Sequence, residues 1–234
     1  MQYLLSASRL ALGVGFAALV ALPAAAVPLA SGSSTTLPGT TVAARPELAG
    51  GVIADRLVDY AFTDGSGTGQ VQERVIRENG TGTLDFAWRV IPDASSTDNV
   101  QDLRIAGFSN FITDGDYRTD GLGTVLPISA FVFGAPFAGD INFRFGDPTV
   151  RTDGLPPTDP SSTFIFLRTT ATQFADTGDL DLARSFASVI TNENSTYAPL
   201  ASAPEPASWA LMILGFGGMG AALRRRQQRA MTAA

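Results

Sequence analysis

The chain has 234 residues, 45% hydrophobic and 16% charged, which suits one packed domain plus addressing segments. It has no His, Cys or Lys, which excludes disulfides, thiolate nucleophiles, Cys- or His-ligated zinc, a Ser-His-Asp triad and Schiff-base chemistry. Five of the 16 basic residues lie in the predicted leader and tail, so 11 arginines face 22 acidic residues elsewhere, and this charge argues against nucleic acid as a partner.

The first 26 residues have the pattern of a secretory signal peptide. A short segment ending at Arg9 precedes the apolar run 10–22, which Pro23 ends. Ala24 and Ala26 then supply small residues at the −3 and −1 positions of a cleavage site. An N-terminal membrane anchor is the alternative, but this run is short of the ~20 residues that span a bilayer. We expect export by the general secretion machinery and cleavage after Ala26.

Residues 27–46 are rich in Ser, Thr and Pro and predict a flexible lead-in, with one edge strand near 40–44. The body, residues 47–200, consists of short apolar runs separated by Gly, Asp, Asn and Pro. Within it, segment 83–90 alternates between apolar and other side chains, as a half-buried antiparallel strand does. Further strands are expected in the following ranges: 52–62, 71–78, 102–112, 128–133, 140–145, 163–174, 180–190 and 195–198.

Short strands with a turn signal about every ten residues predict an all-β body, an antiparallel β-sandwich or a jelly roll. Residues 128–133 form a continuous apolar run that could be buried on both faces. Residues 179–190 also approximate helical spacing, and strand is preferred there because of their β-branched residues. Most of the 15 Phe residues lie in strand candidates, which indicates a core and not a carbohydrate-stacking platform.

Two acidic segments of the body are predicted to be loops. The first carries Asp114, Asp116 and Asp120, and the second carries Asp176, Asp179 and Asp181. Oxygen-rich loops of this kind can bind Ca²⁺, which takes 6–8 oxygen ligands. Neither segment has the EF-hand spacing, and Asp with Gly is also what ordinary turns use. Calcium is therefore a weak hypothesis, and no other metal or cofactor is expected.

The C-terminal tail has three blocks in a fixed order. A linker at 201–206 ends in Pro204, Glu205 and Pro206, and it precedes the uncharged segment 207–223 with its Trp209-Ala210 pair. A basic tail, 224–234, follows and begins with three arginines, Arg224, Arg225 and Arg226. The apolar segment predicts a transmembrane helix with an interfacial Trp and a cytoplasmic basic end.

This tail resembles the PEP-CTERM family of bacterial sorting signals, in the variant where Trp-Ala follows the Pro-Glu-Pro motif. The resemblance implies export, transient retention in the inner membrane, recognition of Pro204 to Pro206 by an exosortase, and release or surface attachment in a Gram-negative bacterium that makes extracellular polysaccharide. An ordinary single-span anchor is the alternative. It explains the apolar run and the arginines but not the spacing from the motif to Trp209.

The sequence leaves the activity of the body open. The first hypothesis is a non-enzymatic structural or binding protein of the cell surface or the extracellular polysaccharide. The second is a secreted hydrolase or lyase that uses Asp and Glu, for which a cleft with two carboxylates beside an aromatic residue would be the sign. A calcium-dependent adhesion module is the third.

Overall fold

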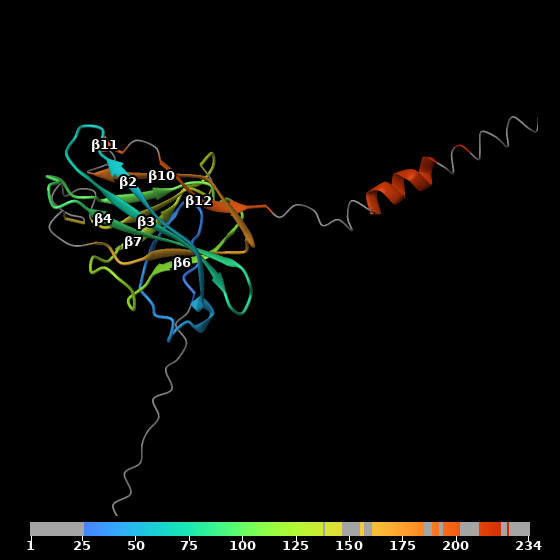
Figure 1. Cartoon of the computed structure of the whole chain (residues 1–234), viewed down its shortest axis with the longest axis horizontal. Helices are drawn as coiled ribbons and strands as arrows, with labels where there is room; N and C mark the ends of the chain where they lie inside the picture. Colours follow the sequence, from blue (N-terminus) through green and yellow to red (C-terminus); the bar gives the residue numbers. More distant parts are fainter. Residues whose placement is uncertain are drawn as a thin grey trace, which may run out of the picture.

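The computed structural model describes residues 26–137, 139–146, 155–156, 161–184, 189–191, 194–201, 211–220 and 224. Its strands form two antiparallel sheets that gather into one body (Figure 1). The predicted all-β, antiparallel architecture is thus confirmed.

The smaller sheet has five strands in the order β2-β3-β4-β9-β6. Their bounds are Gly50–Ala61 (β2), Thr68–Glu78 (β3), Leu84–Pro92 (β4), Ile165–Thr169 (β9) and Ile112–Tyr117 (β6). The first three strands are joined by short turns, whereas β9 returns from far along the chain to lie between β4 and β6.

The larger sheet has seven strands in the order β1-β7-β8-β5-β10-β11, with β12 also paired to β10. Their bounds are Ser33–Thr36 (β1), Ser129–Val132 (β7), Ile141–Arg144 (β8), Asp102–Ile105 (β5), Gln173–Arg184 (β10), Val189–Ile190 (β11) and Asn194–Leu200 (β12).

The inner faces of the two sheets share one hydrophobic core. The alternation in β4 sends Phe86 and Trp88 inward, where both rings pack edge-on against Phe108. The Trp88 indole N–H donates a 3.0 Å hydrogen bond to the hydroxyl of Thr196 on β12, which satisfies its buried polar atom. This bond links the two sheets through the middle of the core.

Part of the segment after residue 26 packs onto the body. Strand β1 pairs with β7 at the edge of the larger sheet. The 3₁₀ helix Pro46–Leu48 (η1) lies on the outer face of the smaller sheet, where Leu48 packs with Phe164 and Phe166 of that face. The edge strand predicted near 40–44 is absent from the described residues of that segment, where Thr40 forms only an isolated bridge with Arg118.

Both acidic segments predicted as loops lie mainly in strands. Residues 112–117 form β6, and residues 173–184 form β10. The prediction was wrong there because Asp and Gly signal turns locally, whereas strand pairing is non-local. Residues 129–132 alternate between half-buried and buried, so this run is not buried on both faces.

The tail contains a helix over residues 211–220. Within the described residues, no helix has the length and apolar character needed to cross a membrane, so the transmembrane helix predicted over 207–223 was not found. The signal segment before residue 26 lies outside the described residues.

Candidate functional site

The predicted processing residues fall mostly outside the described part of the chain. This holds for Ala24, for Pro204, Glu205, Pro206, Trp209 and Ala210, and for Arg225 and Arg226. Ala26 is the first described residue, and Arg224 is helical. Their roles in cleavage and sorting stay predictions.

Asp114 lies in a buried ion-pair network on the outer face of the smaller sheet. It accepts a 2.8 Å hydrogen bond from Arg45, whose side chain is 0% exposed, and it pairs with Arg168 at 3.3 Å. Arg168 on β9 also donates a 2.6 Å hydrogen bond to Glu78 on β3. The Asp114 carboxylate is thus held by two arginines, because a buried charge needs close partners.

Asp85 is the unusual member of this group. It lies opposite Arg168 in the pairing of β4 with β9, yet its Oδ1 atom is 3.9 Å from the Arg168 Nε atom, too far for a hydrogen bond. Its residue surface is only 2% exposed. Burial, with the negative charge of Glu78, raises the pKa of Asp85 to about 8. Asp85 is therefore largely protonated at pH 7.

The other two carboxylates of the first acidic segment have separate partners. Asp116 accepts backbone N–H hydrogen bonds from Gly39 and Tyr117, both of 2.9 Å. Asp120 accepts hydrogen bonds from Arg118 and from the Val42 backbone N–H. Both aspartates thus help to attach the segment after β1 to the body.

The three aspartates of the second acidic segment also have different surroundings. Asp176 forms a bidentate pair with Arg56, at 2.8 and 2.7 Å, which lowers the pKa of its carboxyl group. Arg56 also donates to buried Glu73, so it joins β2, β3 and β10. Asp179 and Asp181 lie further along β10, and the Asp181 Oδ1 atom is 3.9 Å from the Arg104 Nε atom on β5.

Across the described residues, no group of three or more acidic side chains has the geometry to hold a metal ion. Four of the six predicted calcium ligands, Asp114, Asp116, Asp120 and Asp176, instead bind arginines or backbone N–H groups from separate segments.

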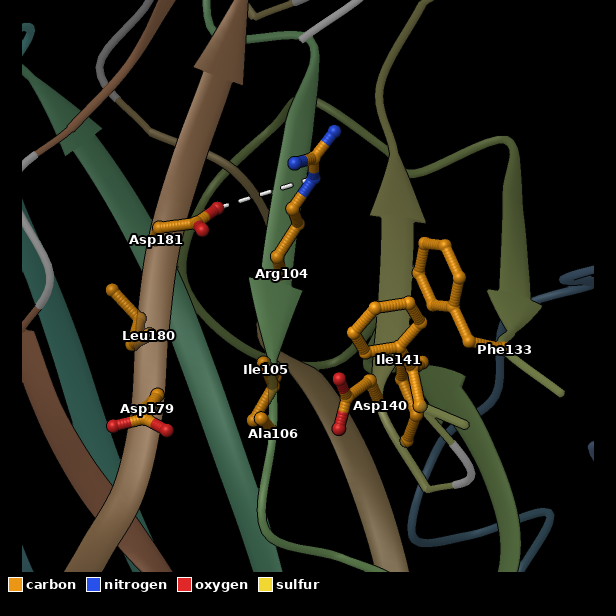
Figure 2. A pocket seen from close by; sticks show the side chains of 10 residues that line it. Arg104, Ile105, Ala106, Phe133, Asp140, Ile141, Asp179, Leu180 and Asp181 are labelled. Atoms are coloured by element: carbon orange, nitrogen blue, oxygen red, sulfur yellow. Dashed lines mark ion pairs between the residues drawn. The ribbon is translucent and has the colours of Figure 1, made fainter. Parts of the chain in front are cut away.

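Asp179 and Asp181 contribute to a groove at one end of the larger sheet (Figure 2). The groove has a volume of about 260 Å³ and includes side chains from β5, β8 and β10. Asp179 and Asp140 lie on either side of Ala106 in Figure 2, and Phe133 flanks Asp140. The lining residues are Arg104, Ile105, Ala106, Phe133, Phe137, Asp140, Ile141, Asp179, Leu180 and Asp181.

Asp140 is an acidic residue of the groove that the sequence did not single out as a candidate. It immediately precedes β8 and is half-buried, and burial together with the negative charge of Asp179 raises the pKa of its carboxyl group. Phe137, 62% exposed, forms part of the same wall. The groove therefore combines acidic side chains with aromatic surface. The only sequence signal for Asp140 was its place at the start of an alternating segment.

Comparison with known proteins identifies the tail and not the body. Residues 202–226 match the PEP-CTERM protein-sorting motif. This match confirms the resemblance found in the sequence and supports export by exosortase-type sorting. Searches among curated proteins and among solved structures found no match to the chain.

Replacing Asp85 tests the buried carboxyl group. The pKa of Asp85 is about 8 in the folded chain against 3.8 for an unperturbed side chain. Between these values the folded chain retains a proton that the unfolded chain releases, so this contribution to stability is full below pH 4 and falls as the pH rises to 8. Asn carries no such proton. We expect Asp85→Asn to gain stability relative to wild type from pH 4.5 to 8.5, by several degrees of melting temperature, since about 1 kcal/mol corresponds to about 2–4 °C at this size.

The control is Asp55→Asn, which removes a more exposed carboxylate on the same sheet face. Its difference from wild type should change much less over this pH range. Equal behaviour of the two variants would contradict the assignment.

Calcium titration tests the two acidic segments. Because most of these carboxylates already have protein partners, we expect 5 mM Ca²⁺, about the weakest affinity range of extracellular modules, to leave the melting temperature of the chelator-treated protein unchanged. Mg²⁺ at the same concentration is the control for ionic strength. A rise of several degrees with Ca²⁺ alone would restore the calcium hypothesis.

Proposed function

We propose that the chain is an exported, non-enzymatic protein of the cell surface or the extracellular polysaccharide matrix of a Gram-negative bacterium, processed by an exosortase. The observation that carries this proposal is the sorting motif at residues 202–226. The signal-peptide pattern at the other end of the chain supports it, because the sorting step acts on exported protein.

The chemistry of the tail suits a temporary membrane handle. Residues 207–223 carry no charge, and Trp209 stands at the end where an interfacial aromatic side chain belongs. The arginines from Arg224 onward then mark the cytoplasmic end. In this orientation the Pro204 to Pro206 motif and the body lie outside the membrane, where an exosortase would cleave.

A structural or binding role for the body is supported by how its charges are used. Arg45, Arg56 and Arg168 each bind two or more carboxylates from separate segments. Such pairs join strands and do not present reactive groups to a substrate. A stable, acidic β-sandwich suits a matrix component.

The groove of Figure 2 favours one alternative, a polysaccharide hydrolase or lyase. Asp140 has a raised pKa and Asp179 lies close enough to contribute to it, as a paired acid and base would require. Phe133 and Phe137 provide an aromatic wall. A calcium-dependent adhesion module has no comparable observation in its favour.

Processing is tested by intact mass and fractionation in the native host. We expect the mature protein to lack residues 1–26 and the basic tail, and to leave the inner membrane. Glu205→Ala should accumulate there as a longer chain, because the exosortase reads the Pro-Glu-Pro motif. Ala201→Ser, just before the matched segment, is the control and should be processed normally. Full-length wild type with its arginines in the membrane would refute the processing step.

The enzymatic alternative is tested with purified protein and exopolysaccharide from the host. A non-enzymatic body should release no reducing ends or unsaturated sugars, and Asp140→Asn should behave like wild type. If Asp140 instead acts as a general acid, wild type will cleave and the variant will lose about 10²–10⁴-fold activity. Asp98→Asn, outside the groove, is the matched control.

A further inference from the structure

The groove at the end of the larger sheet contains a row of side chains whose order follows from the strand register. Phe133, just after β7, donates a 2.9 Å backbone hydrogen bond to Asp140, and Ala106, just after β5, donates one of 2.9 Å to Asp179. Asp140 and Asp179 therefore lie on either side of Ala106, two strands apart (Figure 2). Neighbouring strands are about 4.8 Å apart, so the two aspartate backbones are about 10 Å apart.

Neither of these two carboxylates has a cationic partner among the residues that the structure describes. No described arginine forms an ion pair with Asp140 or Asp179, and no described donor forms a hydrogen bond with their side-chain oxygens. The raised pKa of Asp140, caused by burial and then by the charge of Asp179, agrees with two carboxylates that have no cation between them. A cationic ligand would neutralise this charge.

The lining includes one arginine, Arg104, and a carboxylate stands directly beside it. Arg104 lies opposite Asp181 in the pairing of β5 with β10, and its Nε atom is 3.9 Å from the Asp181 Oδ1 atom. Three aspartates and this one arginine line the groove, so their net charge is −2 when all four are ionised. The groove therefore attracts cations and repels anions.

The groove also has an accessible aromatic wall. Phe137, 62% exposed, belongs to the turn before β8, where its carbonyl accepts a 3.0 Å backbone hydrogen bond from Asp140. Phe133 packs edge-on against Phe131, with ring centres 5.0 Å apart. An aromatic ring beside a carboxylate suits a ligand that combines an apolar face with a positive charge. An amino sugar combines the two, because the C–H groups on one face of its ring are apolar.

We propose that this groove binds an amino sugar of the extracellular polysaccharide, with its ammonium group between Asp140 and Asp179 and its ring against Phe137. The inference rests on the matrix role proposed above and names the ligand class for it. An ammonium group has three hydrogen-bond donors and no acceptor, which suits two facing carboxylates. A neutral sugar would leave both charges uncompensated, and an acidic sugar would be repelled.

The test compares two β-1,4-linked tetrasaccharides, the glucosamine tetramer and cellotetraose, which carries a hydroxyl group in place of each amine. Calorimetry uses the full chain at about pH 6, where the amines are charged. Wild type should bind the glucosamine tetramer at least about fivefold more tightly than cellotetraose, because hydrogen bonds between charged groups are the stronger ones. Added salt should weaken binding of the glucosamine tetramer and leave that of cellotetraose unchanged.

Substitutions separate the charge from the aromatic contact. Asp140→Asn and Asp179→Asn should each reduce the preference for the glucosamine tetramer, and the double variant should remove it. Phe137→Ala should weaken binding of both tetrasaccharides and keep the preference, since it removes packing and no charge. Asp59→Asn is the matched control because it removes an exposed carboxylate of β2 that does not line the groove. It should bind like wild type.

Circular dichroism and melting temperature establish that each variant is folded. The proposal is overturned if wild type shows no preference for the glucosamine tetramer, if the folded double variant keeps that preference, or if Asp59→Asn loses as much of it. This outcome is separate from that of the processing experiment. A processed chain without the preference contradicts the amino-sugar ligand alone, whereas a chain that binds the glucosamine tetramer but keeps its tail contradicts the processing step alone.

Discussion

The buried pairing of Arg45 and Arg168 with Asp114 and Glu78 is the constraint on which the outer face of the smaller sheet depends. Arg45 is fully buried, and a buried guanidinium without a carboxylate would cost several kcal/mol. The network joins the segment before η1 to β6, β9 and β3. By fixing Arg45, it also holds Leu48 over Phe164 and Phe166. The packing of η1 on this face therefore depends on an ion-pair network as well as on apolar contacts.

Acidic residues outside this network join distant segments in the same way, in a chain with no Lys. Asp114, Asp116, Asp120 and Asp176 each bind an arginine or a backbone N–H group from a distant segment. Their carboxylates act as cross-links in a protein that has no cysteine to form disulfides. Asp85 shows the limit of this arrangement. Arg45 and Arg168 cannot neutralise every carboxylate around them, so the carboxyl group of Asp85 keeps its proton.

Local pattern predicted much of the fold, and distant pairing decided the rest. The alternation of Phe86 and Trp88 predicted both strand β4 and its buried face, because burial on a strand repeats every two residues. Residues 114–117 and 176–181 were misread as loops, since Asp and Gly suggest turns when their strand partners are unknown. Those partners are far away in the chain: Arg45 and Asp114 are 69 positions apart, and Arg56 and Asp176 are 120 apart. The groove was not predicted for the same reason. Asp140 immediately precedes β8 and Asp179 lies on β10, and these two strands are brought together because β5 pairs with both.

The difference between local sequence pattern and distant strand pairing also separates the function of the tail from that of the body. A sorting motif is a linear segment that another protein reads, so residue order alone carries its information. Binding surfaces of the body arise only when strands from different parts of the sequence are paired. The groove lies on the larger sheet, and a second cavity, lined in part by Leu48, Ala87 and Phe166, lies on the smaller sheet. Since they share no lining residue, substitutions in one should have effects that add independently to those in the other.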